Sequence, residues 1–230
     1  MRLRRRRISV IIAALIAAAV WLFLNPNSYE EVFTPISDTG AEASVMPALK
    51  VLEELEVKGR APKKGYSREE FYDGWPLVDG CSLRQKILKR ELGETAVLEG
   101  CNVVAGEFDE PYTGEHIVLR NKTNVAQIQI DHVVALSDAW QKGAQYLDYE
   151  TRNKIATDPL NLLAVDGEAN ERKSDGDAAT WLPKNKKFRC QYVARQVSVK
   201  FKYGLWVTEA EKEAISRVLQ NCPNEPVIGI

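Results

Sequence analysis

One of the two histidines in the chain, His132, directly follows Asp131 at the end of an alternating apolar run. Asn161 and Asn170 follow downstream, and Lys173 comes three residues after Asn170. Hydrolysis of a phosphodiester needs an activated water, charge neutralisation at the phosphate and help for the leaving oxygen. Imidazole is a suitable base near neutral pH because its ordinary pKa is about 6.5. The pattern therefore predicts a metal-dependent phosphodiesterase site in which His132 activates water.

A carboxylate and an amide can supply oxygen ligands to a divalent ion at this site. Mg²⁺ keeps several waters and takes few protein oxygens, so Asp131 and Asn170 are a suitable pair. Mn²⁺ would also be accepted, because such sites select weakly among metals. Neighbouring residues on a strand point to opposite faces, so Asp131 and His132 can share a site only if the strand ends or bulges there.

Two strands and a helix must position these residues. Apolar alternation predicts a strand over 128–134 and a second one over 161–165, with a partly helical insertion between them. Gly167 then begins a helix that places Asn170 and Lys173 on one face. Strand, strand and helix together form a small ββα unit.

Four cysteines in an exported chain predict two disulfides. Helical periodicity over 185–203 stops at Gly204, and a capping box at Thr208 begins a second helix. An antiparallel hairpin of these helices brings Cys190 to Cys222 and leaves Cys81 for Cys101. A zinc site built from the four cysteines is disfavoured because the chain has no CxxC pair.

The N-terminus has the charge pattern of an export signal. Arg2 and Arg4 to Arg7 precede an uncharged apolar run from Ile8 to Leu24. The run is long enough for an uncleaved membrane anchor as well as for a cleaved signal, so the rest of the chain is expected outside the cytoplasm, secreted or held to a membrane through residues 8–24. The expected organisation is a signal or anchor over 1–24, a linker over 25–47 and a domain over 48–230 whose ββα core covers about 126–177.

Charge is distributed unevenly along the chain. Five of the 31 basic residues lie in the N-terminal segment, so the remainder is net negative, which argues against nonspecific adhesion to nucleic acid. Between Arg172 and Lys202, however, nine basic residues stand against only two acidic ones. Such a stripe can attract a polyanion, although a solvated helix face has the same composition. The residues expected to contact nucleic acid are Arg120, Arg172, Lys184, Lys186 and Lys187.

The dipeptides Asp131-His132 and Asn161-Leu162, with the run from Asn170 to Asp175, resemble the HNH (ββα-metal) endonuclease motif in its Asn-ending form. The resemblance implies that His132 is the general base, that Asn161 orients it through a backbone contact, and that Lys173 lies near the phosphate. It also implies that Asp131 and Asn170 hold one metal ion.

Longer segments, 130–140 and 158–203, are similar to exported HNH-family proteins related to the GmrSD restriction-type nuclease domain. The long insertion between the two strands departs from the HNH pattern. The chain also lacks the zinc-knuckle cysteines of some HNH enzymes, so no structural zinc is expected.

The expected fold is α+β, with a ββα-metal (HNH) core inside a mostly helical domain with short strands, preceded by an N-terminal signal or anchor helix. The expected function is an exported endonuclease that hydrolyses DNA, or RNA, with one divalent ion and little sequence specificity, and Mg²⁺ is the first choice of metal. The alternatives are a catalytically silent HNH-like module that binds extracellular DNA at the cell surface, and a purely structural exported domain. The complete Asp, His, Asn and Asn set argues against a silent module.

Overall fold

The structure is a computed structural model that describes residues 46–229. The predicted signal or anchor and nearly all of the predicted linker lie outside the described residues. No helix within 46–229 is long and apolar enough to cross a membrane. The described residues form one unit of mixed helices and small antiparallel sheets, which confirms the α+β prediction.

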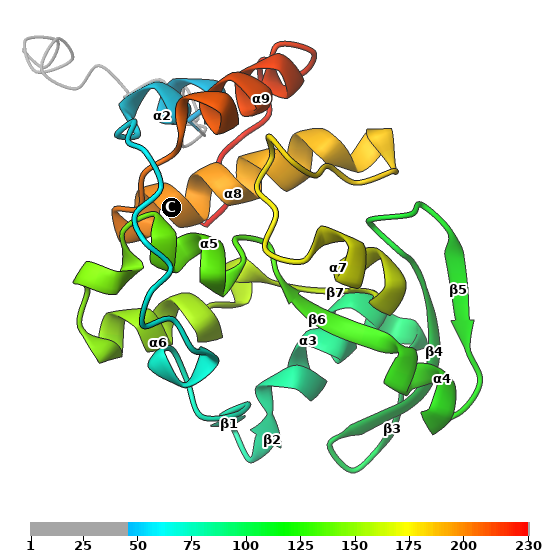
Figure 1. Cartoon of the computed structure of the whole chain (residues 1–230). Helices are drawn as coiled ribbons and strands as arrows, with labels where there is room; N and C mark the ends of the chain where they lie inside the picture. Colours follow the sequence, from blue (N-terminus) through cyan, green and yellow to red (C-terminus); the bar gives the residue numbers. More distant parts are fainter. Residues whose placement is uncertain (1–45, 230) are drawn as a thin grey trace, which may run out of the picture. The chain divides into compact units, whose positions relative to one another are not determined.

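The predicted ββα unit lies at the centre of the fold (Figure 1). Its two strands pair antiparallel in an unbroken register, from Ile128 opposite Asp166 to His132 opposite Leu162. The Asp166 side chain accepts a hydrogen bond from the Ala169 amide at 2.9 Å and so caps the helix that follows. The unit consists of β6 (Ile128–His132), β7 (Leu162–Asp166) and α7 (Gly167–Lys173).

Strand β7 is buried on both faces because its residues alternate between two hydrophobic clusters. Leu163 and Val165 pack into one cluster, whereas Leu162 and Ala164 pack into another. An apolar run of this kind is typical of a strand covered on both sides. The position of β7, and with it that of β6, is therefore set by packing from two directions.

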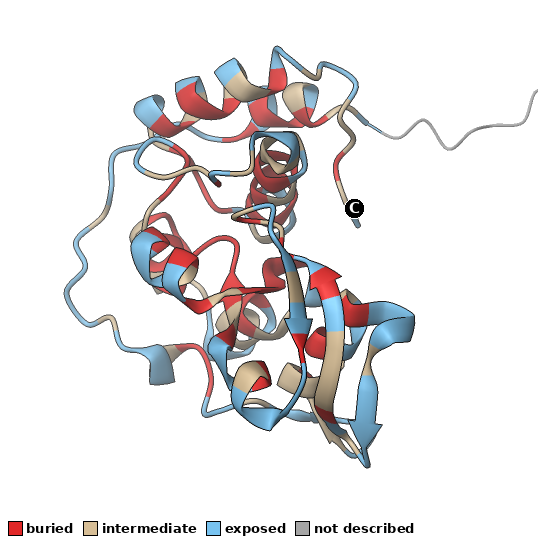
Figure 2. Cartoon of the chain, turned by 90° about the vertical axis from the view of Figure 1, so that its right-hand side faces the viewer, coloured by how far each residue is buried: buried red, intermediate tan, exposed pale blue. Residues whose placement is uncertain are grey.

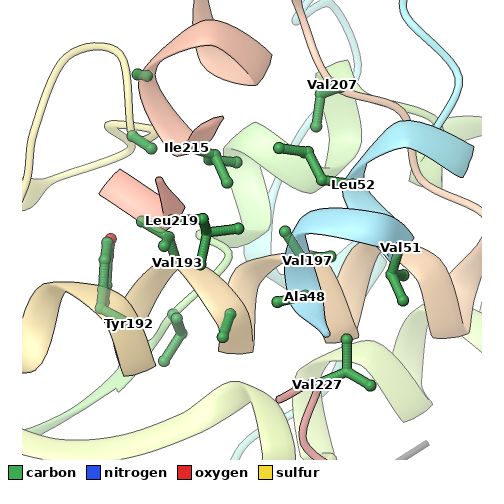
Figure 3. Close-up of a cluster of buried hydrophobic side chains, with 14 of the residues drawn as sticks. Ala48, Val51, Leu52, Tyr192, Val193, Val197, Val207, Ile215, Leu219 and Val227 are labelled. Carbon is green, nitrogen blue, oxygen red and sulfur yellow. The ribbon is translucent and has the colours of Figure 1, made fainter. Parts of the chain in front are cut away.

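A layer of helices covers one side of this unit. Helix α8 (Arg189–Tyr203) buries Tyr192, Val193 and Val197 against α2 (Ala48–Glu54) and α9 (Glu209–Leu219), as Figure 3 shows. Gly204 ends α8 in the left-handed conformation, with φ of 63°. The Thr208 side chain caps α9 by accepting from the Glu211 amide.

Both predicted disulfides are present. Cys190 near the start of α8 is joined to Cys222 just beyond α9, as expected for the helical hairpin. Cys81 is joined to Cys101, which links two hairpins of the outer part of the fold. The Cys190–Cys222 pair crosslinks two helices that also pack together.

The remaining elements flank the centre. A three-stranded sheet carries mostly half-buried or exposed residues, whereas buried residues follow the inward faces of the helices (Figure 2). Toward the N-terminus and in this sheet lie β1 (Leu77–Val78), β2 (Cys81–Ser82), α3 (Leu83–Leu92), β3 (Val97–Glu99), β4 (Asn102–Asp109), β5 (His116–Leu119) and α4 (Lys122–Gln127). The insertion between β6 and β7 contains α5 (Leu136–Gln141), η4 (Ala144–Tyr146), α6 (Tyr149–Thr157) and η5 (Pro159–Asn161).

The segment 56–75, called the arm below, descends in cyan from α2 past α5 to β1 (Figure 1). Val57 bridges to Val207, and the Arg60 guanidinium contacts Asp138 at 3.0 Å and Asp177 at 2.7 Å. At its far end Phe71 is fully buried. The arm is therefore held at both ends, which fixes the residues between them.

The first strand ends two residues earlier than predicted. Its ladder stops at His132 because the Asn161 side chain takes both the amide and the carbonyl of Val134. Asn161 itself lies in the short turn before β7 rather than in the strand. The end of the strand meets the condition under which Asp131 and His132 can share a site.

Candidate active site

Three of the predicted residues, Asp131, His132 and Asn170, line one cavity of about 320 Å³. The end of β6 supplies the first two and the exposed side of α7 supplies the third. The arm and the turn after α7 complete the wall with Lys63, Tyr66, Arg68, Ser174 and Asp175. The structure thus brings together the predicted base and both predicted metal ligands.

His132 is buried, and its ring is held by contacts on several sides. The Nε2 atom lies 2.9 Å from the Ala156 carbonyl oxygen. Since a carbonyl can only accept, Nε2 carries the hydrogen and Nδ1 of the neutral ring is left as an acceptor. The ring stacks on Trp75, with centroids 6.0 Å apart, and also packs against Tyr72.

Burial is the main cause that lowers the pKa of His132, to about 3. The positive charges of Arg68 and Lys173 act in the same direction, whereas the Ala156 hydrogen bond opposes them. The imidazole is therefore neutral over the physiological range. A neutral ring is the form that can accept a proton, but the lowered pKa also makes this ring a weaker base than free imidazole.

Asn161 fixes the backbone on both sides of the His132 ring. Its Oδ1 accepts from the Val134 amide at 2.8 Å, and its own carbonyl accepts from the Val133 amide at 2.8 Å. Its Nδ2 donates to the Ile155 carbonyl at 3.0 Å, next to the Ala156 carbonyl that contacts His132. Asn161 thus contacts the backbone around His132, and its role of orienting the base stays a prediction.

Asp131 has a separate, buried set of partners. The Tyr112 hydroxyl donates to Oδ2, and the Lys173 ammonium donates to Oδ1 at 2.9 Å. Burial raises the pKa of the Asp131 carboxyl, while Lys173 and Tyr112 act in the opposite direction. Burial and the nearby Asp131 charge raise the pKa of Tyr112 well above its ordinary value, so Tyr112 keeps its proton as a donor.

Lys173 does not lie where the sequence placed it. It is only 1% exposed, and its ammonium contacts both Asp131 and the His132 carbonyl, each at 2.9 Å. A buried ammonium needs such partners because leaving it unpaired is costly. The expected position near the phosphate is therefore corrected: Lys173 lies behind Asp131 and supports it.

The donor set fits a divalent ion that keeps most of its waters. The Nδ2 atom of Asn170 donates to Gln129 Oε1 at 2.8 Å, which leaves the amide oxygen as the free ligand atom beside Asp131. Within residues 46–229, the only three acidic, histidine or cysteine side chains grouped closely enough to hold an ion are Cys190, Cys222 and Glu225, and both cysteines are in a disulfide. A carboxylate with one amide suits Mg²⁺ better than an ion that needs an all-protein cage.

The arm supplies residues that the sequence analysis missed. Arg68 lies over the Tyr72 ring and donates to the Tyr72 hydroxyl at 2.9 Å, and among the described residues it forms no ion pair. Lys63, in contrast, is paired with Asp175 at 2.8 Å. The arm lies far from the motif in sequence and its spacing gives no signal of this proximity, so only the fold shows it.

The predicted nucleic-acid contacts do not line the cavity. Lys184, Lys186 and Lys187 line a separate hollow of about 840 Å³, together with acidic residues such as Asp109. Arg172 on α7 is exposed and paired with Glu168, and Arg120 is exposed after β5. Contact of these five residues with nucleic acid stays a prediction.

Comparison with known proteins places this site in a family. Residues 84–218 match the family described as GmrSD restriction endonucleases, C-terminal domain. An uncharacterized secreted protein of Arthroderma benhamiae is 34% identical over 182 residues, which cover 78% of this chain and 86% of that protein. No solved structure matches the chain. Since the matched segment spans more than half of the chain and contains Asp131, His132, Asn161 and Asn170, the chain belongs to the family of GmrSD restriction endonuclease C-terminal domains.

Proposed function

We propose that the protein is an exported, metal-dependent endonuclease that hydrolyses DNA by an HNH-type mechanism. The observation that carries the proposal is His132, whose Nε2 lies 2.9 Å from the Ala156 carbonyl oxygen and which lines the same cavity as Asp131 and Asn170. Family membership supports nuclease chemistry. The two disulfides and the secreted relative support a location outside the cytoplasm.

His132 acts as the general base. Its Nδ1 takes a proton from water, and the proton then resides on that atom. The Nε2–H bond to the Ala156 carbonyl strengthens when the ring becomes positively charged. Trp75 and Tyr72 pack against the ring and hold its orientation.

Asp131 and Asn170 would hold the divalent ion. When bound, the ion neutralises charge that develops on the phosphate. Lys173 and Tyr112 orient the Asp131 carboxylate, and Gln129 orients the Asn170 amide. These contacts hold both side chains in place beside the cavity.

Arg68 binds the scissile phosphate in place of Lys173. A guanidinium without a carboxylate partner can donate two hydrogen bonds to one phosphate. Lys63 adds a second cation on the same wall. Contacts of this kind read the backbone rather than the bases, so we expect little sequence preference.

The proposal is tested by incubating supercoiled plasmid with the protein, its disulfides formed, in Mg²⁺ or Mn²⁺ and in EDTA. We expect nicking and then linear DNA in either metal and intact plasmid in EDTA. Failure to cleave plasmid, single-stranded DNA or RNA in any of these metals would contradict the proposal. Plasmid binding without cleavage would instead favour a silent DNA-binding module at the cell surface.

A further inference from the structure

The carboxylate proposed to hold the ion is already paired within the protein. Lys173 and Asp131 lie 2.9 Å apart, with 0% and 6% of their side chains exposed. The position of Lys173 in the last turn of α7 also favours a positive charge at the helix end. Because the pair is shielded from water, its electrostatic interaction is stronger than that of a surface pair.

The rest of the cavity adds no unpaired negative charge. Its other carboxylate, Asp175, is paired with Lys63 at 2.8 Å and accepts from the Ser137 hydroxyl. Arg68 contributes a positive charge without an ion-pair partner in the described part of the chain. A divalent cation that enters the free protein therefore meets a cavity whose fixed charges are balanced or positive.

A phosphodiester changes this balance because it brings a negative charge to the cavity. We infer that Lys173 is a built-in countercharge that makes divalent-ion binding depend on the substrate phosphate, so that ion and substrate bind together. The inference rests on the proposed function and adds the coupling between ion binding and substrate binding. Mg²⁺ commonly shares its coordination between one or two carboxylates and substrate phosphates, which is the arrangement this cavity favours.

The coupling is measured with Mn²⁺, whose free form is counted by electron paramagnetic resonance. Titrations use the protein with His132→Ala, in which we expect slow cleavage, with and without a short DNA duplex. The binding of Mn²⁺ to the duplex alone is subtracted. We expect the duplex to raise the Mn²⁺ affinity of the protein by roughly tenfold or more, as a favourable charge interaction in a shielded site implies. An equal affinity in both titrations overturns the inference.

Lys173 itself is tested by adding Lys173→Met, which keeps the length of the side chain and removes its charge. This change should raise the affinity for Mn²⁺ without duplex by roughly tenfold, whereas Lys173→Arg and the exposed control Lys89→Met should leave it unchanged. The inference is overturned if Lys89→Met also raises the Mn²⁺ affinity, or if a folded Lys173→Met protein does not raise it. If Lys173→Met does not fold, the duplex titrations decide alone.

The two proposals fail in different ways. If the wild-type protein cleaves plasmid in Mn²⁺ but its Mn²⁺ affinity ignores the duplex, the coupling is wrong and the nuclease assignment stands. If the wild-type protein neither cleaves nor binds Mn²⁺ with or without duplex, the proposed function fails and the coupling fails with it.

Discussion

The two histidines of the chain show how surroundings assign different chemistry to one residue type. His116 is exposed beside Asp109 and Glu107, which raise its pKa. His132 is buried between aromatic rings and a carbonyl, and its pKa falls to about 3. Only His132 is held neutral in a cavity with a carboxylate and an amide.

Arg68 is the residue whose loss should show whether the arm contributes to the site. We predict that Arg68→Ala lowers kcat/KM for plasmid cleavage roughly 10- to 100-fold, because hydrogen bonds to a charged group contribute about 1.5–3 kcal/mol. The matched control is Arg217→Ala, an exposed arginine on α9 paired with Glu213. Equal losses in both variants would show that Arg68 has no special contact with the phosphate.

At the residue scale, the sequence identified which residues meet but not what each one contacts. Asp131, His132 and Asn170 share a cavity as predicted. The position of Lys173 was not predicted correctly. Its ammonium pairs with the Asp131 carboxylate, which also accepts from Tyr112, and the sequence gives no signal of this contact. Arg68 was missed for the same reason.

At the scale of elements, the turn η5 and the end of β6 are joined by one amide side chain. Asn161 satisfies buried backbone groups of Val134 and Ile155. We predict that Asn161→Ala lowers the free energy of unfolding by roughly 1–3 kcal/mol for each buried group left unpaired. Urea unfolding measures the change.

Two further variants serve as a comparison and a control for the Asn161→Ala prediction. Asn161→Asp keeps the acceptor for the Val134 amide but places a second oxygen against the Val134 and Ile155 carbonyls at a fully buried position, so its loss should be at least as large as that of Asn161→Ala. Asn221→Ala removes an exposed amide at the end of α9 and should change stability by no more than about 0.5 kcal/mol. A loss in Asn161→Ala as small as that in Asn221→Ala would mean that the Asn161 hydrogen bonds contribute little to stability.

Elements with strong local signals were predicted well. The helical hairpin of α8 and α9 follows from apolar periodicity, the Gly204 stop and the Thr208 cap, and Cys190–Cys222 confirms it. Helix α4 was not predicted, because only Val125 is buried in it and its start depends on a cap from Asn121. Short elements like this one are set by tertiary context more than by their own pattern.

The whole molecule is held partly by a buried group of charges that joins segments far apart in sequence. The Lys142 ammonium, just beyond α5, contacts Asp138 on α5, Asp177 in the loop after α7 and Glu211 on α9, at 2.6–2.8 Å. Lys200 on α8 contacts Asp138 and Glu211, and the arm enters through Arg60. The same group therefore orders the helical layer and the arm that reaches the site.

This group predicts how stability depends on pH. Burial by itself would raise the pKa of Asp177. Lys142 and the neighbouring cations outweigh burial and lower this pKa to about 2, below the ordinary value of 3.8. A carboxylate whose pKa is lowered by folding stabilises the protein above the unfolded pKa and loses that contribution as the pH falls toward the folded pKa. We predict a loss of stability between about pH 4 and 2, measured by urea unfolding.

Asp177→Asn should reduce the slope of stability against pH in that range, and Asp73→Asn, at an exposed position, should leave the slope unchanged. Parallel curves for the wild type and Asp177→Asn would contradict the assignment. The group was not predicted from sequence, because its members come from α5, α8, α9 and two loops, and its two lysines carry no signal that they are buried.

The most direct test of the account compares the two histidines in plasmid cleavage with Mg²⁺. We predict that His132→Ala lowers the rate by about 10²- to 10⁴-fold, the usual contribution of a general base, while His116→Ala cleaves as the wild type does. DNA binding, followed by fluorescence anisotropy in EDTA, should be the same in all three proteins. Near wild-type cleavage by a folded His132→Ala protein, or an equal loss in both variants, would contradict the claim that His132 is the base of a nuclease site.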